Sequence, residues 1–142
     1  MRTVRQLLGA KAPDVFAVPP AAAVIQAIRL MAEKSIGAVL VMEEGALAGI
    51  LSERDYARKV VLKGRSSSDT AVREIMTAEV VTVGPETSIE KCMALMTERR
   101  IRHLPVLASG QVMGVVSIGD LVKAVIEDQQ LQLAQLQQYI AG

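Results

Sequence analysis

Two short segments of the sequence carry a serine and an aspartate at the same spacing. The shared pattern is glycine, two aliphatic residues, serine, two free positions and aspartate, and it gives Ser52 with Asp55 and Ser117 with Asp120. In each segment we predict that a strand ends at the serine and a helix begins just after it. The hydroxyl and the first helical N–H groups then point towards one place, which favours an anion. The carboxylate can accept two hydrogen bonds from a vicinal diol, the usual task of an acidic residue that faces a ribose.

The alternative interpretation is a serine and aspartate helix cap that holds no ligand. One copy of the pattern does not separate the two interpretations. Two copies at identical register favour the ligand.

The two segments belong to a longer internal repeat. Residues 15–61 align without a gap with residues 80–126, and 13 of the 47 aligned pairs are identical. Two copies are too few for a solenoid or a propeller, which needs at least three units to build a continuous core. The sequence therefore predicts a pair of half-size modules related by a pseudo-twofold axis.

Each copy is predicted to run strand, helix, strand, strand, helix. In the second copy Thr87 or Ser88 caps a helix whose apolar stripe is Ile89, Cys92, Met93 and Met96. Turn residues separate the remaining elements. The predicted strands are residues 15–18, 38–42, 47–51, 80–83, 103–107 and 112–116, the last helix of each copy starts near residue 54 or 119, and short helices at 4–8 and 71–76 precede the copies. Residues 63–69 form a polar loop between them.

Composition restricts the class of protein. The 142 residues are 51% hydrophobic and only 2% aromatic, with a formal net charge of +1 and no basic run longer than two residues, so a nucleic-acid partner is not indicated. A single cysteine, Cys92, excludes an internal disulfide and a cysteine-rich zinc site. No stretch approaches the ~20 apolar residues of a membrane span, and the first ten residues lack a signal-peptide core. We expect a soluble protein of the reducing cytoplasm, without a membrane or metal partner.

The order and spacing of these segments resemble the cystathionine-β-synthase (CBS) domain family, and specifically a stand-alone tandem pair, the Bateman module. The resemblance rests on Val83 and Pro85, the helix end at residues 96–101, the run Arg-His-Leu-Pro-Val at 102–106 and the two Gly-x-x-Ser-x-x-Asp segments. It implies an α+β fold of two β-α-β-β-α units packed sheet to sheet. The expected boundaries are 1–65 and 66–128 for the repeats and 129–142 for a C-terminal helical extension.

The family resemblance also implies two clefts that bind adenine nucleotides. The first site would use Ser52, Asp55, Met76, Val81, Thr82, Arg102 and His103. In the second, Arg54 would reach the phosphate from across the axis, and the other residues would be Phe16, Ala17, Gly37, Ala38, Ser117 and Asp120.

The two expected sites differ in charge. Arg102 and His103 correspond to Gly37 and Ala38, so one site has a cationic wall and the other has almost none. In addition, Leu40 stands where the family has a proline, which the second copy retains. We therefore expect unequal affinities. Arg99 and Arg100 are interpreted separately, as solvated charges near the C-terminal end of a helix.

These features favour a non-catalytic sensor of AMP, ATP or NAD that changes its conformation or its partner affinity. An enzyme with a catalytic cofactor is not expected, because His103 is the sole histidine and no nucleophile and base recur together. Two alternatives stay open. One is a structural or interaction module whose clefts are empty, and the other is a regulatory subunit that acts in trans on an unknown enzyme or transporter.

The C-terminal segment predicts a homodimer. Ile126, Leu133 and Ile140 lie seven residues apart, with Leu136 between them, on an otherwise glutamine-rich helix. We expect this stripe, together with other helix faces, to pair two copies of the chain. The alternative is that the stripe folds back on its own domain.

Overall fold

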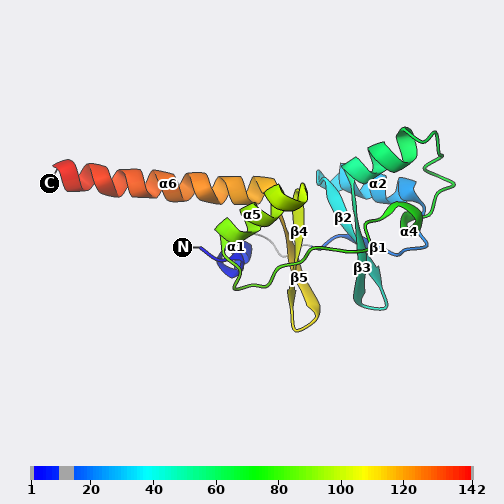
Figure 1. Ribbon diagram of the computed structural model, residues 1–142, viewed down its shortest axis with the longest axis horizontal. Coiled ribbons are helices and arrows are strands. Elements are labelled where there is room, and N and C mark those ends of the chain that lie inside the picture. The colour runs from blue at the N-terminus through cyan, green and yellow to red at the C-terminus, as the bar shows by residue number, and fades with distance from the viewer. Residues whose placement is uncertain (1, 10–14, 142) are drawn as a thin grey trace.

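The chain forms two similar halves whose sheets face each other in the middle of the molecule, with helices on both outer sides (Figure 1). This computed structural model describes residues 2–9 and 15–141. One sheet has the order β1-β2-β3 and the other is the hairpin β4-β5. The predicted α+β fold of two repeats is confirmed. Its elements are α1 (Val4–Gly9), β1 (Ala17–Val18), α2 (Val24–Lys34), β2 (Ala38–Glu43), β3 (Ala46–Ser52), α3 (Glu53–Tyr56), the π-helix η1 (Ala57–Val61), α4 (Val72–Ile75), α5 (Ile89–Arg99), β4 (His103–Ala108), β5 (Gln111–Ser117) and α6 (Ile118–Ala141).

The two β-hairpins are the most similar parts of the halves. Their ladders run from Ala38 opposite Ser52 and from His103 opposite Ser117, and the register shifts at the same point in both. Each turn has two residues with positive φ, the second of which is a glycine, as a tight hairpin turn requires. The four hairpin strands agree with the prediction to within about one residue at each end.

The first strand of each copy is shorter than predicted. Residues 15–18 form a strand only at Ala17–Val18, and residues 80–83 make one bridge, between Val83 and Val106. In the first half the Leu40 N–H donates to the Phe16 carbonyl at 3.0 Å. Pro105 takes the place of Leu40 in the second half and has no N–H to donate. The predicted strand at 80–83 was therefore wrong, because proline removes the hydrogen bond that would extend it.

The two short helices that precede the repeats exchange places. Val4 and Leu7 of α1 are buried in the core of the second half, and Val72 and Ile75 of α4 are buried in the core of the first. Isolated bridges between Thr3 and Ser88 and between Ala23 and Ala71 hold the segments that carry these two helices in place. Each half thus depends on the other to cover its core.

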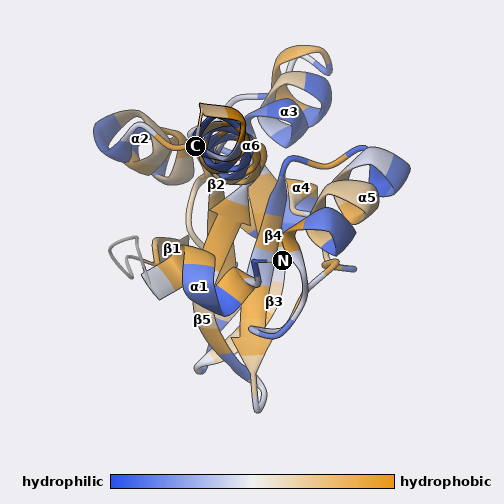
Figure 2. Ribbon diagram, turned by 90° about the vertical axis from the view of Figure 1, so that its left-hand side faces the viewer, coloured by the Kyte–Doolittle hydropathy of each residue, from blue (hydrophilic) through white to orange (hydrophobic). Residues whose placement is uncertain are grey.

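The cores are aliphatic, as the composition predicted. Figure 2 shows hydrophobic strands between helices that are hydrophilic on part of their surface. Ile89, Cys92 and Met96 of the predicted stripe are buried together, and burial raises the pKa of the Cys92 thiol. Ser88 caps α5 by accepting the Lys91 N–H at 3.1 Å.

Helix α6 is the longest element and continues well past the rest of the molecule (Figure 1). The predicted extension from residue 129 is the second part of this same helix, and its described residues are all exposed. Within residues 2–9 and 15–141, no helix is long and apolar enough to cross a membrane.

The close approach of α4 to β3 yields a testable asymmetry. A Cβ on Gly49 would lie 2.7 Å from Met76 Sδ and 2.9 Å from the Thr77 carbonyl oxygen, which also accepts the Ile50 N–H. At the equivalent Gly114 a Cβ would meet only the end of Leu8, at 3.1 Å. We expect Gly49→Ala to lower the free energy of unfolding by about 1–3 kcal/mol, because backbone must move.

Gly114→Ala is the matched control. It should lower the free energy of unfolding by less than about 1 kcal/mol, because the end of the Leu8 side chain can shift. Urea unfolding followed by circular dichroism measures both. Equal losses in the two variants would contradict this account of the Gly49 contact.

Candidate functional site

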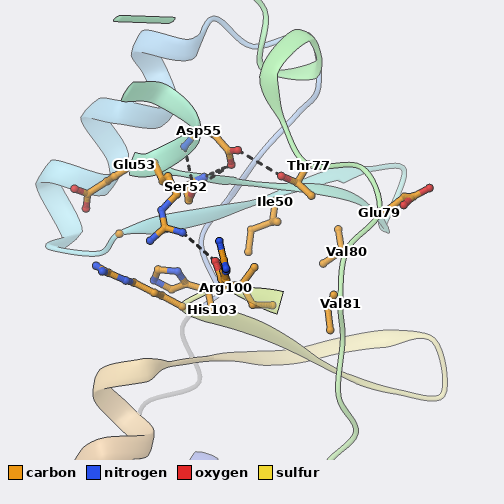
Figure 3. A pocket seen from close by; sticks show the side chains of 14 residues that line it. Ile50, Ser52, Glu53, Asp55, Thr77, Glu79, Val80, Val81, Arg100 and His103 are labelled. Atoms are coloured by element: carbon orange, nitrogen blue, oxygen red, sulfur yellow. Dashed lines mark hydrogen bonds between the residues drawn. The ribbon is translucent and has the colours of Figure 1, made fainter. Parts of the chain in front are cut away.

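A cavity of about 270 Å³ lies between the two halves, at the end of β3. Three parts of the chain surround it: the end of β3 with the start of α3, the segment after α4, and the segment that leads into β4. Figure 3 shows Ser52, Asp55 and Thr77 at one end of the cavity, Val80 and Val81 on a second side, and Arg100 and His103 on a third. The lining residues are Gly37, Ile50, Ser52, Glu53, Arg54, Asp55, Thr77, Glu79, Val80, Val81, Arg100, Ile101, Arg102 and His103.

Ser52 and Asp55 form a reciprocal cap at the start of α3. The Asp55 N–H donates to Ser52 Oγ at 3.2 Å, and Asp55 Oδ2 accepts the Ser52 N–H at 3.0 Å and the Ser52 hydroxyl at 3.1 Å. Such a capping box satisfies two backbone donors that a helix start leaves without a partner. Ser117 and Asp120 repeat it, with backbone-to-side-chain distances of 2.9 and 3.2 Å. The cap that the sequence left as an alternative is thus present in both halves.

The cap leaves the second carboxylate oxygen of Asp55 for other partners. Oδ1 accepts the Thr77 hydroxyl at 3.4 Å and lies 3.2 Å from the Lys59 amine. The same Lys59 amine donates to the Ile75 carbonyl oxygen at 2.9 Å. A capped aspartate can therefore also face a ligand, provided the ligand hydroxyls replace the long Thr77 contact.

Sequence reasoning missed Lys59 and Thr77. The spacing of Asp55 and Lys59, four residues apart on a helix, is a recognisable ion-pair signal. Thr77 gave no such signal. Its hydroxyl comes close to Asp55 only because the backbones of Thr77 and Ile50 pair, and these two residues are far apart in the sequence. In the second half the position equivalent to Lys59 is occupied by Ala124.

Three arginines also line the cavity. Arg102 was predicted together with its neighbour His103, whereas Arg54 and Arg100 were not assigned to this site. Arg54 Nη1 donates to the Arg100 carbonyl oxygen at 2.9 Å. A Cβ on Gly37 would lie 3.3 Å from His103 Cε1, so the glycine allows the imidazole to approach.

The residues proposed for the first site are brought together in part. Ser52, Asp55, Val81, Arg102 and His103 line the cavity. Met76 instead packs against Gly49 and the core of the first half, and Thr82 is exposed and lies outside the lining.

The residues proposed for the second site lie on several elements of the two halves. Gly37 and Arg54 line the cavity of the first site. The other residues are placed as follows. Phe16 packs on the first core, Ala17 is in β1 and Ala38 pairs with Ser52, while Ser117 and Asp120 form the second cap.

Comparison with known proteins identifies the repeats. The family model of the CBS domain matches residues 4–62 and 72–127. The CBS domain-containing protein CBSX3, mitochondrial, of Arabidopsis thaliana is 46% identical over 124 residues, which cover 84% of this chain and 60% of the relative. The chain thus spans about three fifths of the length of that protein.

Solved structures agree on the fold. A CBS-domain protein from Burkholderia ambifaria MC40-6 is 56% identical, with a TM-score of 0.88 over 90% of this chain and 96% of that chain. The CBS domain pair of protein MJ0100, solved in complex with 5′-methylthioadenosine and S-adenosyl-L-methionine, has a TM-score of 0.79 at 19% identity, over 89% of this chain and 98% of that chain. At that identity the second likeness shows the fold alone.

The reciprocal cap predicts a stability cost for removing its carboxylate. We expect Asp55→Ala to fold but to lower the free energy of unfolding by about 0.5–2 kcal/mol, as other cap deletions do. Asp69→Ala, which removes an exposed loop carboxylate, should change the free energy of unfolding by less than about 0.5 kcal/mol. Urea unfolding measures both, and an Asp55→Ala variant as stable as the wild type would show that the cap contributes little.

Proposed function

The chain belongs to the CBS domain family, and we propose that it is a non-catalytic regulatory sensor that binds an adenine nucleotide between its two repeats. The ligand is of the AMP, ATP or NAD type. The observation that carries the proposal is the cavity itself, which has a carboxylate and hydroxyl end at Asp55 and Thr77 and a cationic wall at Arg102 and His103.

Each part of a nucleotide finds complementary chemistry in this cavity. The aliphatic side chains of Ile50, Val80 and Val81 offer an apolar surface to the base. The ribose diol suits Asp55 Oδ1, and the phosphate suits Arg102, whose guanidinium can fork onto two oxygens. The MJ0100 pair, which carries two adenosine compounds, supports an adenosine ligand for this fold.

No reaction is assigned to the site. Cys92 is the sole thiol of the chain, it is fully buried, and burial raises its pKa, so it is not a nucleophile. Such a free, unpaired thiol fits the cytoplasm that we propose as the setting. A ligand that favours one arrangement of the two halves would then alter the surface offered to an effector protein.

We also propose that the chain pairs with a second copy through α6. Val122, Ile126, Leu133, Leu136 and Ile140 follow the spacing of a coiled-coil seam, and they are between 41 and 75% exposed. The structure does not show the stripe folded back on its own domain, because residues 129–141 are exposed throughout. A helical segment of this length is marginal alone in water. The chain has no charged residue after Asp128, so two identical helices meet without like-charge repulsion there.

The first test is nucleotide binding. Calorimetry with AMP, ADP, ATP and NAD should show micromolar-scale binding, about −8 kcal/mol, and bound ligand should raise the melting temperature. Asp55→Ala should weaken binding to the first site by at least about tenfold, because a charged acceptor is lost, whereas Asp69→Ala should bind like the wild type. No heat and no thermal shift at millimolar ligand would favour the alternative, a structural or interaction module with unoccupied clefts.

The second test is the oligomeric state. Light scattering should show a dimer for the wild type and a monomer for Leu136→Glu, because two carboxylates would then face each other in an apolar seam. Gln138→Glu, which adds the same charge on the opposite side of the helix, should remain a dimer. A monomeric wild type would contradict the proposal. A dimeric Leu136→Glu variant would show that other helix faces form the interface.

A further inference from the structure

A second cavity adjoins the first, and three of the four residues that separate them are arginines. It measures about 250 Å³ and shares Arg54, Arg100, Ile101 and Arg102 with the first cavity. Its remaining lining residues are Met96, Thr97 and Ile118, so three cations line it and no carboxylate does. Among the residues that the structure describes, none of the three arginines forms an ion pair with an acidic side chain.

The partition is held in place by backbone contacts. Arg54, from α3, donates Nη1 to the Arg100 carbonyl oxygen at 2.9 Å. Arg100 ends α5 and donates its own N–H to the Met96 carbonyl oxygen. The Arg102 carbonyl oxygen accepts the Ile118 N–H at 2.8 Å. Four parts of the chain thus place three exposed arginines around one cavity.

The fold does not require these charges. The positions equivalent to Arg54, Arg100 and Arg102 in the other half are Gly119, Ser35 and Gly37. Ser35 and Arg100 adopt the same left-handed conformation, with φ of 55° in both, so the helix end forms equally well without arginine.

We infer that the second cavity is a subsite for the distal phosphates of a ligand whose nucleoside lies in the first. The site then takes a nucleoside di- or triphosphate in preference to a monophosphate, an inference that rests on the proposed function. Arginine pairs well with phosphate because its planar fork of N–H groups matches two oxygens. Thr97 lines the same cavity, although its hydroxyl donates to the Met93 carbonyl oxygen at 2.9 Å, so its oxygen is left as an acceptor and the arginines supply the donors.

The competing interpretation is that these arginines only offset the dipole at the end of α5. It accounts for Arg99 and Arg100, which lie at that end, but not for Arg54, which comes from α3. Arg99 lines neither cavity. Replacing Arg99 removes the same charge from the same helix end and is therefore the matched control for Arg100.

The test compares ligands that differ only in phosphate number. Calorimetry with adenosine, AMP, ADP and ATP in magnesium-free buffer at constant ionic strength should show ATP binding at least about tenfold more tightly than AMP, and tenfold is 1.4 kcal/mol. Arg100→Ala should abolish this preference for ATP over AMP, and Arg99→Ala should keep it. Inorganic tripolyphosphate should compete with ATP but not with adenosine.

Equal affinities for AMP and ATP in the wild type would overturn the subsite and leave the proposed function standing. An equal fall of the ratio in Arg99→Ala and Arg100→Ala would also overturn it, because only total charge would then matter. If no adenine compound binds, the proposed function fails on its own. The subsite is then judged by tripolyphosphate alone, whose binding should be lost in Arg100→Ala and kept in Arg99→Ala.

Discussion

The exchange of the short helices α1 and α4 is the constraint on which the rest of the structure depends. Each helix buries two aliphatic side chains in the core of the opposite half, so neither half has a complete apolar core by itself. This exchange holds the two sheets face to face and fixes the segment after α4 beside β3. The cavity exists because that segment, β3 and the start of β4 are held together by the exchange.

Within this framework the hairpins and helix caps keep their pseudo-symmetry while the side chains around them do not. The hairpins have the same register and the same bulge, and both halves use the Ser/Asp capping box. The first cavity, by contrast, is lined by three arginines, and Lys59 lies beside Asp55. A duplicated fold can therefore carry different side chains on hairpins and helix caps whose main-chain geometry is the same.

Sequence reasoning worked where the signal was local. The hairpins were predictable because their turns contain Gly45 and Gly110, and α5 was predictable from Ser88 and its apolar stripe. The loss of the strand expected at residues 80–83 was not predictable, because the pairing there depends on the missing N–H of Pro105 on another strand. The exchange of α1 and α4 was not predictable either, since the sequence of an apolar helix face does not indicate which core the helix packs on. For the same reason, Arg100 was interpreted as a helix-end charge until the structure placed it beside Arg54.

The capping box has a consequence for how such sites change over time. Asp55 uses one oxygen to start a helix and turns the other towards the cavity, so one carboxylate serves both folding and recognition. A mutation there is selected against for its effect on folding even in a copy that has no ligand to bind. The Ser-x-x-Asp pattern can then be retained for its effect on folding after the site has lost its ligand. Wall residues such as Arg102 carry no such structural duty through their side chains, and they are the positions at which recognition is free to appear, diverge or vanish.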